Sequence, residues 1–362
     1  MEVIMLELSR FADCHIHMEI NDFKKTESML DFISTLGVTD ATILCLENYL
    51  GCDRANMFSA LYFKTHYKKI NVRVFGSLYE FDIYKDVPFL DQLKRMMKMG
   101  CDGIKLMNMK PDVRKALGRG LNHPIYEPMF AYLEKTQFPI MLHAADPEEF
   151  WGDPAKMLAG QVAAGWCYAD GTFPSYKQIY DEVYEVLDRH PKLNMTIAHF
   201  FFLSNDIDEA RRIFEKYPNL HLDLTPGHEM YLGFSKDIPA WREFFKKYSD
   251  RILFGTDSTT TRDNDITYKK YALVARALSY DENEFPIPRN PELSVRGLHL
   301  DRDVIEKICY ENYMKFIEET AADVDMEYVR AEAQKMLTDT KAYGNLETTA
   351  AVLEEFLERT VG

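Results

Sequence analysis

The sequence predicts an α/β protein of the (β/α)8 class, a TIM barrel with extra helices at its C-terminal end. Two observations support this prediction. Eight short apolar runs alternate along the chain with eight segments in which apolar residues recur at helical spacing. The apolar runs are also continuous rather than alternating, as expected for parallel strands that are covered on both faces. An alternation of strand and helix repeated eight times is typical of this barrel.

The predicted elements follow one another from residue 10 to residue 278. Strands are expected at 10–17, 41–46, 73–78, 103–107, 140–143, 195–199, 221–224 and 252–255. Helices are expected at 26–36, 55–67, 89–99, 124–135, 175–189, 206–216, 238–247 and 267–278. The main rival is a doubly wound open sheet, which usually carries a glycine-rich phosphate turn after its first strand. Here that position holds Asp13-Cys14-His15-Ile16-His17, which favours the barrel.

Two segments go beyond a minimal barrel. Residues 144–174 form a long connection after the fifth strand, and loops of this length are usually functional or disordered. We expect this loop to lie over the barrel mouth. Further helices are expected at 302–318, 324–338 and 347–358, packed on the barrel or on a partner subunit. The predicted organisation is therefore a metal-dependent barrel at 1–320 and a helical extension at 321–362, in a homo-oligomer.

Composition limits the partners and the compartment. Lys and Arg number 43 and Asp and Glu 58, so the net charge is −15, which argues against nucleic acid or an anionic membrane as a partner. The start of the chain lacks the features of a signal peptide, and no apolar run approaches the roughly 18 residues of a spanning helix. The six cysteines (14, 45, 52, 101, 167 and 309) show no paired spacing, which indicates reduced thiols. We expect a cytoplasmic protein that binds a small molecule.

Ligand-type side chains stand at the ends of several predicted strands. His15 and His17 are two residues apart, so on a strand their side chains point to the same face. Each of the others ends a later apolar run: Lys105, His143, His199 and Asp257. Because the C-terminal ends of barrel strands meet at one mouth, all six should lie together. Neutral imidazoles and a carboxylate suit zinc or another borderline divalent metal.

This set of residues supports specific chemistry. A metal with an open coordination position can bring the pKa of its bound water near neutrality, and Asp257 is the candidate base for that water. Lys105 has three open readings: a buried salt bridge, a clamp for a substrate carboxylate or, if carbamylated, a bridge between two metals. His228, on the loop after the seventh strand, is expected to contact substrate. Trp151 is expected to cap the pocket, with a role as hydrophobic anchor of the long loop as the alternative.

These motifs resemble the amidohydrolase superfamily, and specifically its amidohydrolase 2 branch of metal-dependent TIM-barrel hydrolases and decarboxylases. The matching pieces, spread over roughly 10–317, are Asp13-Cys-His15-Ile-His17, Gly103-Ile-Lys105-Leu, Pro139-Ile-Met-Leu-His143, Ile197-Ala-His199, Leu253-Phe-Gly-Thr-Asp257-Ser and Ile308-Cys-Tyr-Glu-Asn312-Tyr. The resemblance implies that His15, His17, His143 and Asp257 bind one divalent metal ion, expected to be zinc. It also implies that His199 polarises the substrate carbonyl or orients the water. One departure is Met107-Asn108-Met109, where the family often has His-Pro.

Three functions are compatible with these residues. The favoured one is a metal-dependent hydrolase, in which metal-activated water attacks an amide, lactone or ester carbonyl. The second is a metal-dependent non-oxidative decarboxylase of a small aromatic or enoic acid. The third is a barrel that binds a ligand without turnover, against which the intact set of His15, His17, His143, His199 and Asp257 argues. Release of carbon dioxide would distinguish the second function from the first.

Overall fold

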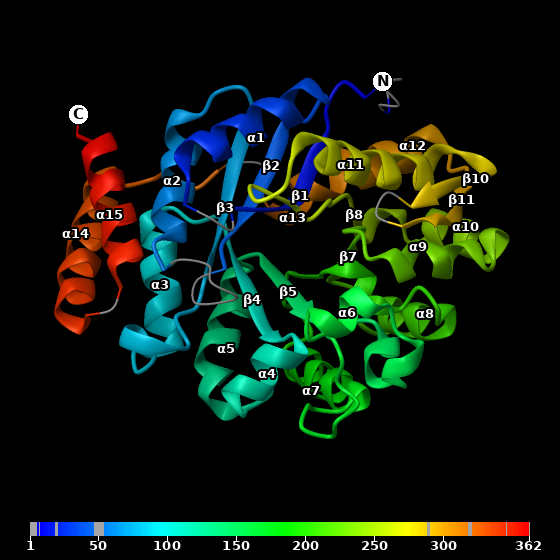
Figure 1. Ribbon diagram of the computed structural model, residues 1–362, viewed down its shortest axis with the longest axis horizontal. Helices are drawn as coiled ribbons and strands as arrows, with labels where there is room; N and C mark the ends of the chain where they lie inside the picture. The colour runs from blue at the N-terminus through cyan, green and yellow to red at the C-terminus, as the bar shows by residue number, and fades with distance from the viewer. Residues whose placement is uncertain are drawn as a thin grey trace.

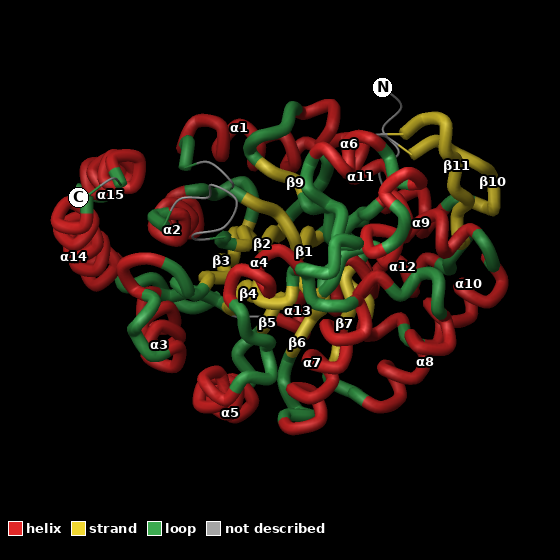
Figure 2. Tube along the Cα trace, turned by 60° about the horizontal axis from the view of Figure 1, so that its bottom comes forward, coloured by secondary structure: helices red, strands yellow, loops and turns green. Residues whose placement is uncertain are grey.

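The computed structural model describes residues 6, 8–18, 21–46, 54–287, 290–317, 321–344 and 346–361. Eight parallel strands succeed one another in chain order around the sheet, which confirms the predicted barrel class (Figures 1 and 2). They are β1 (Ala12–His17), β2 (Asp40–Leu44), β3 (Asn71–Ser77), β4 (Gly103–Met109), β5 (Ile140–Ala144), β6 (Met195–Ile197), β7 (Leu220–Asp223) and β8 (Ile252–Leu253). A short strand, β9 (Ser258–Thr259), pairs with the other edge of β1.

Helices surround the sheet (Figure 2). The eight predicted helices are α1 (Phe23–Thr35), α2 (Asn56–His66), α3 (Phe89–Met99), α5 (Glu127–Thr136), α7 (Tyr176–Arg189), α8 (Ile207–Lys216), α10 (Ile238–Lys247) and α11 (Asn264–Ser279). Three shorter ones lie in the connections after β4, β5 and β7: α4 (Pro111–Leu117), α6 (Ala159–Ala163) and α9 (His228–Ser235). Several helices begin at a residue whose side chain accepts a hydrogen bond from a first-turn amide: Asp22, Ser175, Asp206, Asp237 and Asp263. Each such cap satisfies an N–H that the helix itself leaves without a partner.

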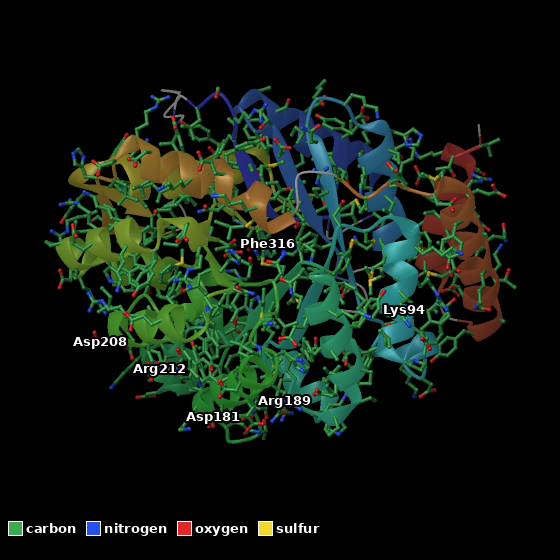
Figure 3. The ribbon with its side chains drawn as sticks, turned by 180° about the vertical axis from the view of Figure 1, so that it is seen from behind. Lys94, Asp181, Arg189, Asp208, Arg212 and Phe316 are labelled. Carbon is green, nitrogen blue, oxygen red and sulfur yellow. The ribbon has the colours of Figure 1, made fainter. Side chains whose placement is uncertain are left out.

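Backbone hydrogen bonds join the first and last strands of the barrel. Just beyond β8, the carbonyl of Phe254 accepts from the N–H of Cys14 at 3.0 Å, and the N–H of Asp257 donates to the carbonyl of His15 at 2.8 Å. The barrel interior is filled by Ala12, Cys14, Leu44, Phe75, Met141, Ala198 and Leu253, together with Tyr313, Phe316 and Ile317 from α13 (Asn312–Ile317). Phe316 therefore lies near the centre of the molecule in Figure 3, and α13 plugs the barrel.

A β-bulge in β1 decides which side chains face the interior. Between Asp13 and Ile16, β1 carries one residue more than the matching part of β2. Cys14 already belongs to the interior cluster, so strict alternation would send His15 and His17 outward. The extra residue reverses the alternation, and Ile16 joins the outer core while the two imidazoles face each other inside.

The C-terminal helices pack on the barrel of the same chain. The predicted helix at 302–318 is divided into α12 (Arg302–Glu306), a π-helical turn (Lys307–Glu311) and α13, and it is followed by α14 (Met326–Tyr343) and α15 (Glu347–Arg359). α14 and α15 lie beside α2 and α3 (Figure 1). The hydroxyl of Tyr84 donates to Asp339 at 2.8 Å, and the rings of Phe58 and Phe356 are 5.8 Å apart. The domain boundary at residue 320 stays a prediction.

A β-hairpin just before the C-terminal helices in the chain also has no counterpart among the predicted elements. β10 (Asp281–Ile287) and β11 (Asn290–Leu298) form an antiparallel hairpin in which Phe285 pairs with Val295. Both of these side chains are buried. Closely spaced acidic residues and prolines interrupt the apolar pattern of this segment, so it does not look like a strand in the sequence. Within the described residues, no helix has both the length and the apolar composition that crossing a bilayer requires.

A buried ion pair connects the sheet to the C-terminal extension. The ammonium of Lys64 in α2 lies 2.7 Å from Asp102, and these side chains are 5% and 3% exposed. Asp102 also accepts from the N–H of Val74 in β3 and from the N–H of Ala322, both at 2.9 Å. One carboxylate thus binds a helix, a strand and the segment that leads to α14.

Removing this carboxylate should destabilise the fold strongly. In an Asp102→Asn variant, Lys64 would remain buried without its counter-ion, so we expect the free energy of unfolding to fall by about 3–5 kcal/mol. Chemical denaturation measures this loss. The exposed pair Lys216–Asp188, at 2.6 Å, provides a matched control, since Asp188→Asn should cost about 1 kcal/mol or less. Equal losses in the two variants would contradict the assignment.

Candidate metal centre at the barrel mouth

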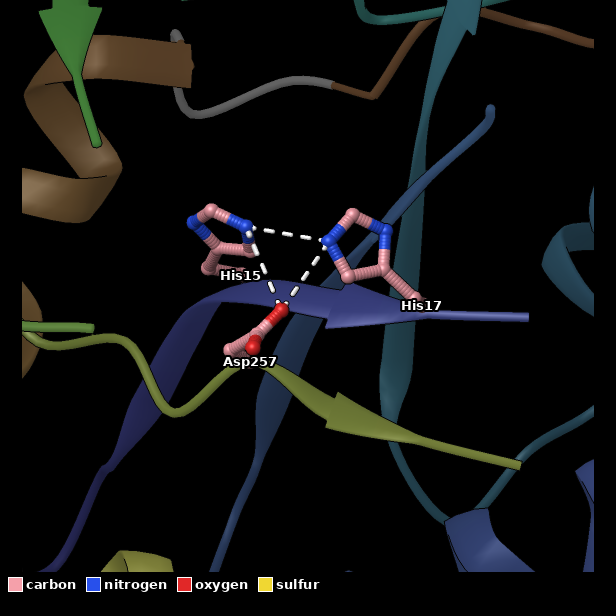
Figure 4. Close-up of side chains that lie close together, drawn as sticks. All are labelled: His15, His17 and Asp257. Carbon is pink, nitrogen blue, oxygen red and sulfur yellow. Dashed lines mark hydrogen bonds and ion pairs between the residues drawn. The ribbon is translucent and has the colours of Figure 1, made fainter. Parts of the chain in front are cut away.

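Three side chains from the first and last strands converge at the barrel mouth (Figure 4). His15 and His17 come from β1, and Asp257 comes from the turn between β8 and β9. Nε2 of His15 lies 3.1 Å from Nε2 of His17. Oδ1 of Asp257 lies 3.2 Å from Nε2 of His17 and 3.9 Å from Nε2 of His15. Two imidazole nitrogens and a carboxylate oxygen this close together fit the donor set of a divalent metal such as zinc.

In each ring, the hydrogen bond made by Nδ1 determines whether Nε2 carries a proton or a lone pair. Nδ1 of His15 lies 2.7 Å from the buried carboxylate of Asp223, and Nδ1 of His17 lies 3.0 Å from the carbonyl oxygen of Leu44. Both partners accept hydrogen bonds, so both Nδ1 atoms carry the proton when the rings are neutral. The two Nε2 atoms then direct lone pairs toward each other and toward a third acceptor, Asp257. A cation placed between these three acceptors would offset the repulsion among them.

A buried carboxylate ties the β1 bulge to the segment that carries Asp257. Oδ1 of Asp13 accepts from the N–H of His15 at 2.9 Å and from the N–H of Thr256 at 3.2 Å. Oδ2 accepts from the hydroxyls of Thr256 and Tyr271, both at 2.6 Å. Burial raises the pKa of Asp13 to about 6, although these four hydrogen bonds favour the ionised form. Asp13 thereby fixes the spacing between the imidazoles and Asp257.

Asp257 is held in an uncommon backbone conformation beside a lysine. Its φ angle is 54°, in the left-handed region. Its side chain is 38% exposed, and its Oδ2 lies 3.5 Å from Nζ of Lys270. Desolvation by surrounding protein would raise the pKa of Asp257, but Lys270, followed by His17 and His15, lowers this pKa well below its usual range. The carboxylate is therefore ionised at neutral pH.

The imidazoles of His15 and His199 are neutral at the same pH. Burial, followed by the charge of Lys105, lowers the pKa of His15 well below its usual value. Burial, followed by the influence of His143, lowers the pKa of His199 to about 4. Neutral imidazoles are the form that binds metals.

His143 lies beside the three converging residues rather than among them. Its Nε2 lies 3.1 Å from the carbonyl oxygen of Ala145 and 3.4 Å from Oδ1 of Asp146. Its ring centroid lies 4.8 Å from that of His199. Burial lowers the pKa of His143, so its ring is neutral too. One of its nitrogens is engaged by the long loop, and its predicted role as a metal ligand stays a prediction.

The long loop reaches the site through Asp146. Besides His143, this carboxylate accepts from the hydroxyl of Tyr168 at 2.5 Å and from Nζ of Lys110 at 3.1 Å. Burial would raise the pKa of Asp146, but Lys110 and His143 hold it well below its usual range. The carboxylate of Asp146, near the start of the loop, and the hydroxyl of Tyr168, near its end, are therefore joined beside a site histidine.

His199 begins the 3-10 turn η5 (His199–Phe202) directly after β6. Its N–H donates to Oδ1 of Asp223 at 2.8 Å, and its Nδ1 lies 3.2 Å from the carbonyl oxygen of Thr225. Its ring centroid lies 5.6 Å from that of His15. Since a carbonyl only accepts, Nδ1 carries the proton, and Nε2 remains available as an acceptor.

Lys105, in β4, is the largest charged side chain buried in the barrel mouth. It is 1% exposed, and its Nζ has no hydrogen-bond partner within the part of the chain that the structure describes. Burial lowers the pKa of its ammonium to about 8, opposed by the charges of Asp223 and Asp257. Lys105 also lines a cavity of about 20 Å³ with Ser77, Leu78, Glu80, Phe81, Met107, Asn108 and Val113. That volume accommodates about one water molecule or one small polar group.

The other two residues predicted to contact substrate are Trp151 and His228. The indole N–H of Trp151 donates to the carbonyl of Pro174 at 2.9 Å, and its ring packs on Tyr168 and Tyr176. These contacts match the anchoring alternative, because they join the two ends of the long loop. The side chain of His228 lies outside the described part of the structure.

Several residues that the structure brings to the site were not predicted from the sequence. Asp223 holds His15 and His199, Asp13 holds the bulge, and Asp146 holds His143. A signal exists for Asp223, since it lies at the C-terminal end of the seventh strand, as His143 lies near that of the fifth. Asp13 carries a weaker signal as a charged residue inside an apolar run, while Asp146 is one of many acidic residues in its loop.

The chain is similar to known proteins in sequence and in fold. A family profile described as amidohydrolase matches residues 82–316. An uncharacterised TIM-barrel protein from Bordetella bronchiseptica has a TM-score of 0.52 at 15% identity, with 85% of this chain and 98% of that chain covered. A candidate amidohydrolase from Staphylococcus aureus has a TM-score of 0.52 at 17% identity, with coverages of 85% and 99%. IDCase from Metarhizium anisopliae, in apo form, has a TM-score of 0.51 at 14% identity, with coverages of 85% and 97%.

At these identities the solved structures show a shared fold. No curated protein matches the chain in sequence. The family profile is the stronger finding, because it covers more than half of the chain and includes Lys105, His143, His199 and Asp257. By that match, the chain belongs to the amidohydrolase 2 family.

Proposed function

We propose that this protein is a metal-dependent hydrolase that opens an amide, lactone or ester bond of a small molecule. The observation that carries the proposal is the meeting of three acceptor atoms, Nε2 of His15, Nε2 of His17 and Oδ1 of Asp257, at separations of 3.1, 3.2 and 3.9 Å. When the rings are neutral and both Nδ1 atoms donate elsewhere, these acceptors have no proton to share. One divalent ion, for which zinc is the best match, satisfies all three.

The residues of the mouth have distinct roles in this proposal. His15, His17 and Asp257 would hold the ion, with His143 as a further candidate ligand. When bound, such an ion acts as a Lewis acid and makes water a nucleophile near neutral pH. Asp257 would receive the proton of that water and return it to the leaving group. Its low pKa favours the return step, because a weak base gives up a proton readily.

His199 would position the attacking water. With Nδ1 donating to the carbonyl of Thr225, its Nε2 can accept a hydrogen bond from a water molecule. The same tautomer cannot donate to a substrate carbonyl through Nε2. Of the two roles that the family resemblance implies for His199, orientation of the water is therefore the one that this hydrogen-bonding pattern supports.

Non-oxidative decarboxylation is the second candidate, and Lys105 is the observation that favours it. A buried ammonium without a hydrogen-bond partner is costly unless a ligand supplies acceptor oxygens. A substrate carboxylate would do so. The cavity beside Lys105, with room for about one water molecule, marks where an oxygen of such a group could lie. Every decarboxylase substrate bears such a carboxylate, whereas a hydrolase would use this contact only with a substrate that also carries one.

The first test concerns metal content. We expect about one zinc-like ion per chain, measured by elemental analysis of purified protein, and loss of that ion in the His15→Ala, His17→Ala double variant. Because burial lowers the pKa of His15, wild-type protein should keep its metal as the pH falls below the usual histidine value of about 6.5. His66→Ala, at an exposed histidine, is the control and should bind normally. Full occupancy in the double variant would refute the site.

The second test concerns the base. Asp257→Asn keeps the shape of the side chain but cannot take up a proton, so turnover should fall by about 2–4 orders of magnitude. Metal content is measured on the same samples, because the substitution also weakens a candidate ligand. Near-normal turnover with metal retained would show that Asp257 is a spectator and would direct attention to His199.

The third test separates the two candidate reactions. A panel of small acids, amides and lactones is assayed for carbon dioxide release and for hydrolysis, and we expect hydrolysis. Lys105→Met, similar in shape but uncharged, should lower kcat/KM for carboxylate-bearing substrates by about 10–100-fold, the value of a hydrogen bond to a charged group. Lys115→Met, which removes an exposed charge nearby, is the control. Carbon dioxide release without hydrolysis would favour the decarboxylase.

A further inference from the structure

The backbone is left-handed over four consecutive residues after β6. The φ angles of His199, Phe200, Phe201 and Phe202 are 56°, 52°, 52° and 52°. None of the four is glycine, and left-handed backbone is unfavourable for every other residue, least so for Asn and Asp. Bulky aromatic residues in this region are rare, and such strain persists only where the surroundings enforce it.

The middle of this turn is enforced by the core. Phe200 and Phe201 are completely buried. The ring of Phe200 stacks with that of Phe245, and the ring of Phe201 stacks with that of Tyr180 at 4.4 Å. The hydroxyl of Tyr180 also donates to the carbonyl of Phe201 at 2.6 Å. These contacts explain how the strained conformation is held.

The two residues at the ends of the turn are less buried than the two in its middle. His199 and Phe202 are half-buried, and their rings stack with centroids 5.3 Å apart and planes inclined by 22°. The ring of Phe202 also lies 6.1 Å from that of His143. In a 3-10 turn the first and fourth residues lie on the same side. The turn thus presents one imidazole and one phenyl ring, side by side, next to the candidate metal centre.

We propose that Phe202 is a specificity-determining residue that stacks on the flat part of a bound substrate, and that the left-handed turn is kept because it places this ring beside His199. The inference rests on the proposed function, since it needs a ligand held at the mouth. The ligand class it indicates is one with a planar, unsaturated group next to the carbon that reacts. Stacking on the face of an aromatic ring favours such groups over saturated ones.

The first measurement tests the strain and needs neither metal nor substrate. At an ordinary helical or extended position, glycine is less stable than alanine. At a left-handed position the order reverses, so Phe202→Gly should melt about 2–4 °C above Phe202→Ala. Both variants lose the ring, so their difference reports the backbone alone. If Phe202→Ala melts at the same temperature or higher, residue 202 is not held under strain and the proposal is wrong.

The second measurement tests the ring against two metal-binding probes. Acetohydroxamate and benzohydroxamate share the same chelating head, and only the second carries a planar ring. In calorimetric titrations of zinc-loaded protein, we expect Phe202→Ala to bind acetohydroxamate with the affinity of wild type. Its preference for benzohydroxamate over acetohydroxamate should be about 3–10-fold smaller than that of wild type. Phe202→Tyr should keep that preference. Phe201→Leu, a change in the buried part of the turn, should lower Tm without altering the preference for benzohydroxamate.

The outcomes separate this inference from the proposed function. Binding of both hydroxamates with an unchanged preference in Phe202→Ala would overturn the role of Phe202 and leave the metal centre standing. Failure of wild-type protein to bind either hydroxamate would overturn the metal centre and, with it, the role assigned to Phe202. A preference lost in Phe202→Ala and kept in Phe202→Tyr would support the proposal.

Discussion

Four hydrogen bonds converge on Asp13, and the geometry of the barrel mouth depends on them. The carboxylate holds the amide of His15 on one side and both the amide and the hydroxyl of Thr256 on the other, with Tyr271 closing the set. It therefore pins the β1 bulge against the turn that bears Asp257. Without that bulge the alternation of β1 would turn His15 and His17 away from the interior. A supporting residue thus controls the position of all three candidate ligands.

The mouth brings several unfavourable features together in one place. Lone pairs face each other at His15 and His17, Lys105 is buried with no hydrogen-bond partner among the described residues, and Asp257 and the turn from His199 have left-handed backbone. Each of these costs free energy in isolation. The aromatic core around Phe200 and Phe201 keeps the turn from His199 in place. Such concentration of unfavourable features is typical of sites that bind a ligand.

How far the sequence predicts this protein depends on how local each feature is. All eight strands were predictable to within two residues, because continuous apolar runs of this length report burial on both faces. The pairing of His15 with His17 also followed from strand periodicity, although the bulge that makes it possible did not. The roles of Asp223 and Asp146 depend on partners far away in sequence or on loop geometry. The left-handed turn was out of reach, because phenylalanine carries no signal for positive φ.

The closure of the barrel brings together residues that are synthesised at different times. His15 is synthesised before Asp257, which shares its site and follows 242 positions later, and the plug α13 comes after both. Closing so long a loop adds little to the entropic cost but slows folding, because contacts distant in sequence form late. A nascent chain on the ribosome would therefore carry two histidines that have no carboxylate partner until most of the protein has emerged. Metal capture would be among the last events in the maturation of this barrel.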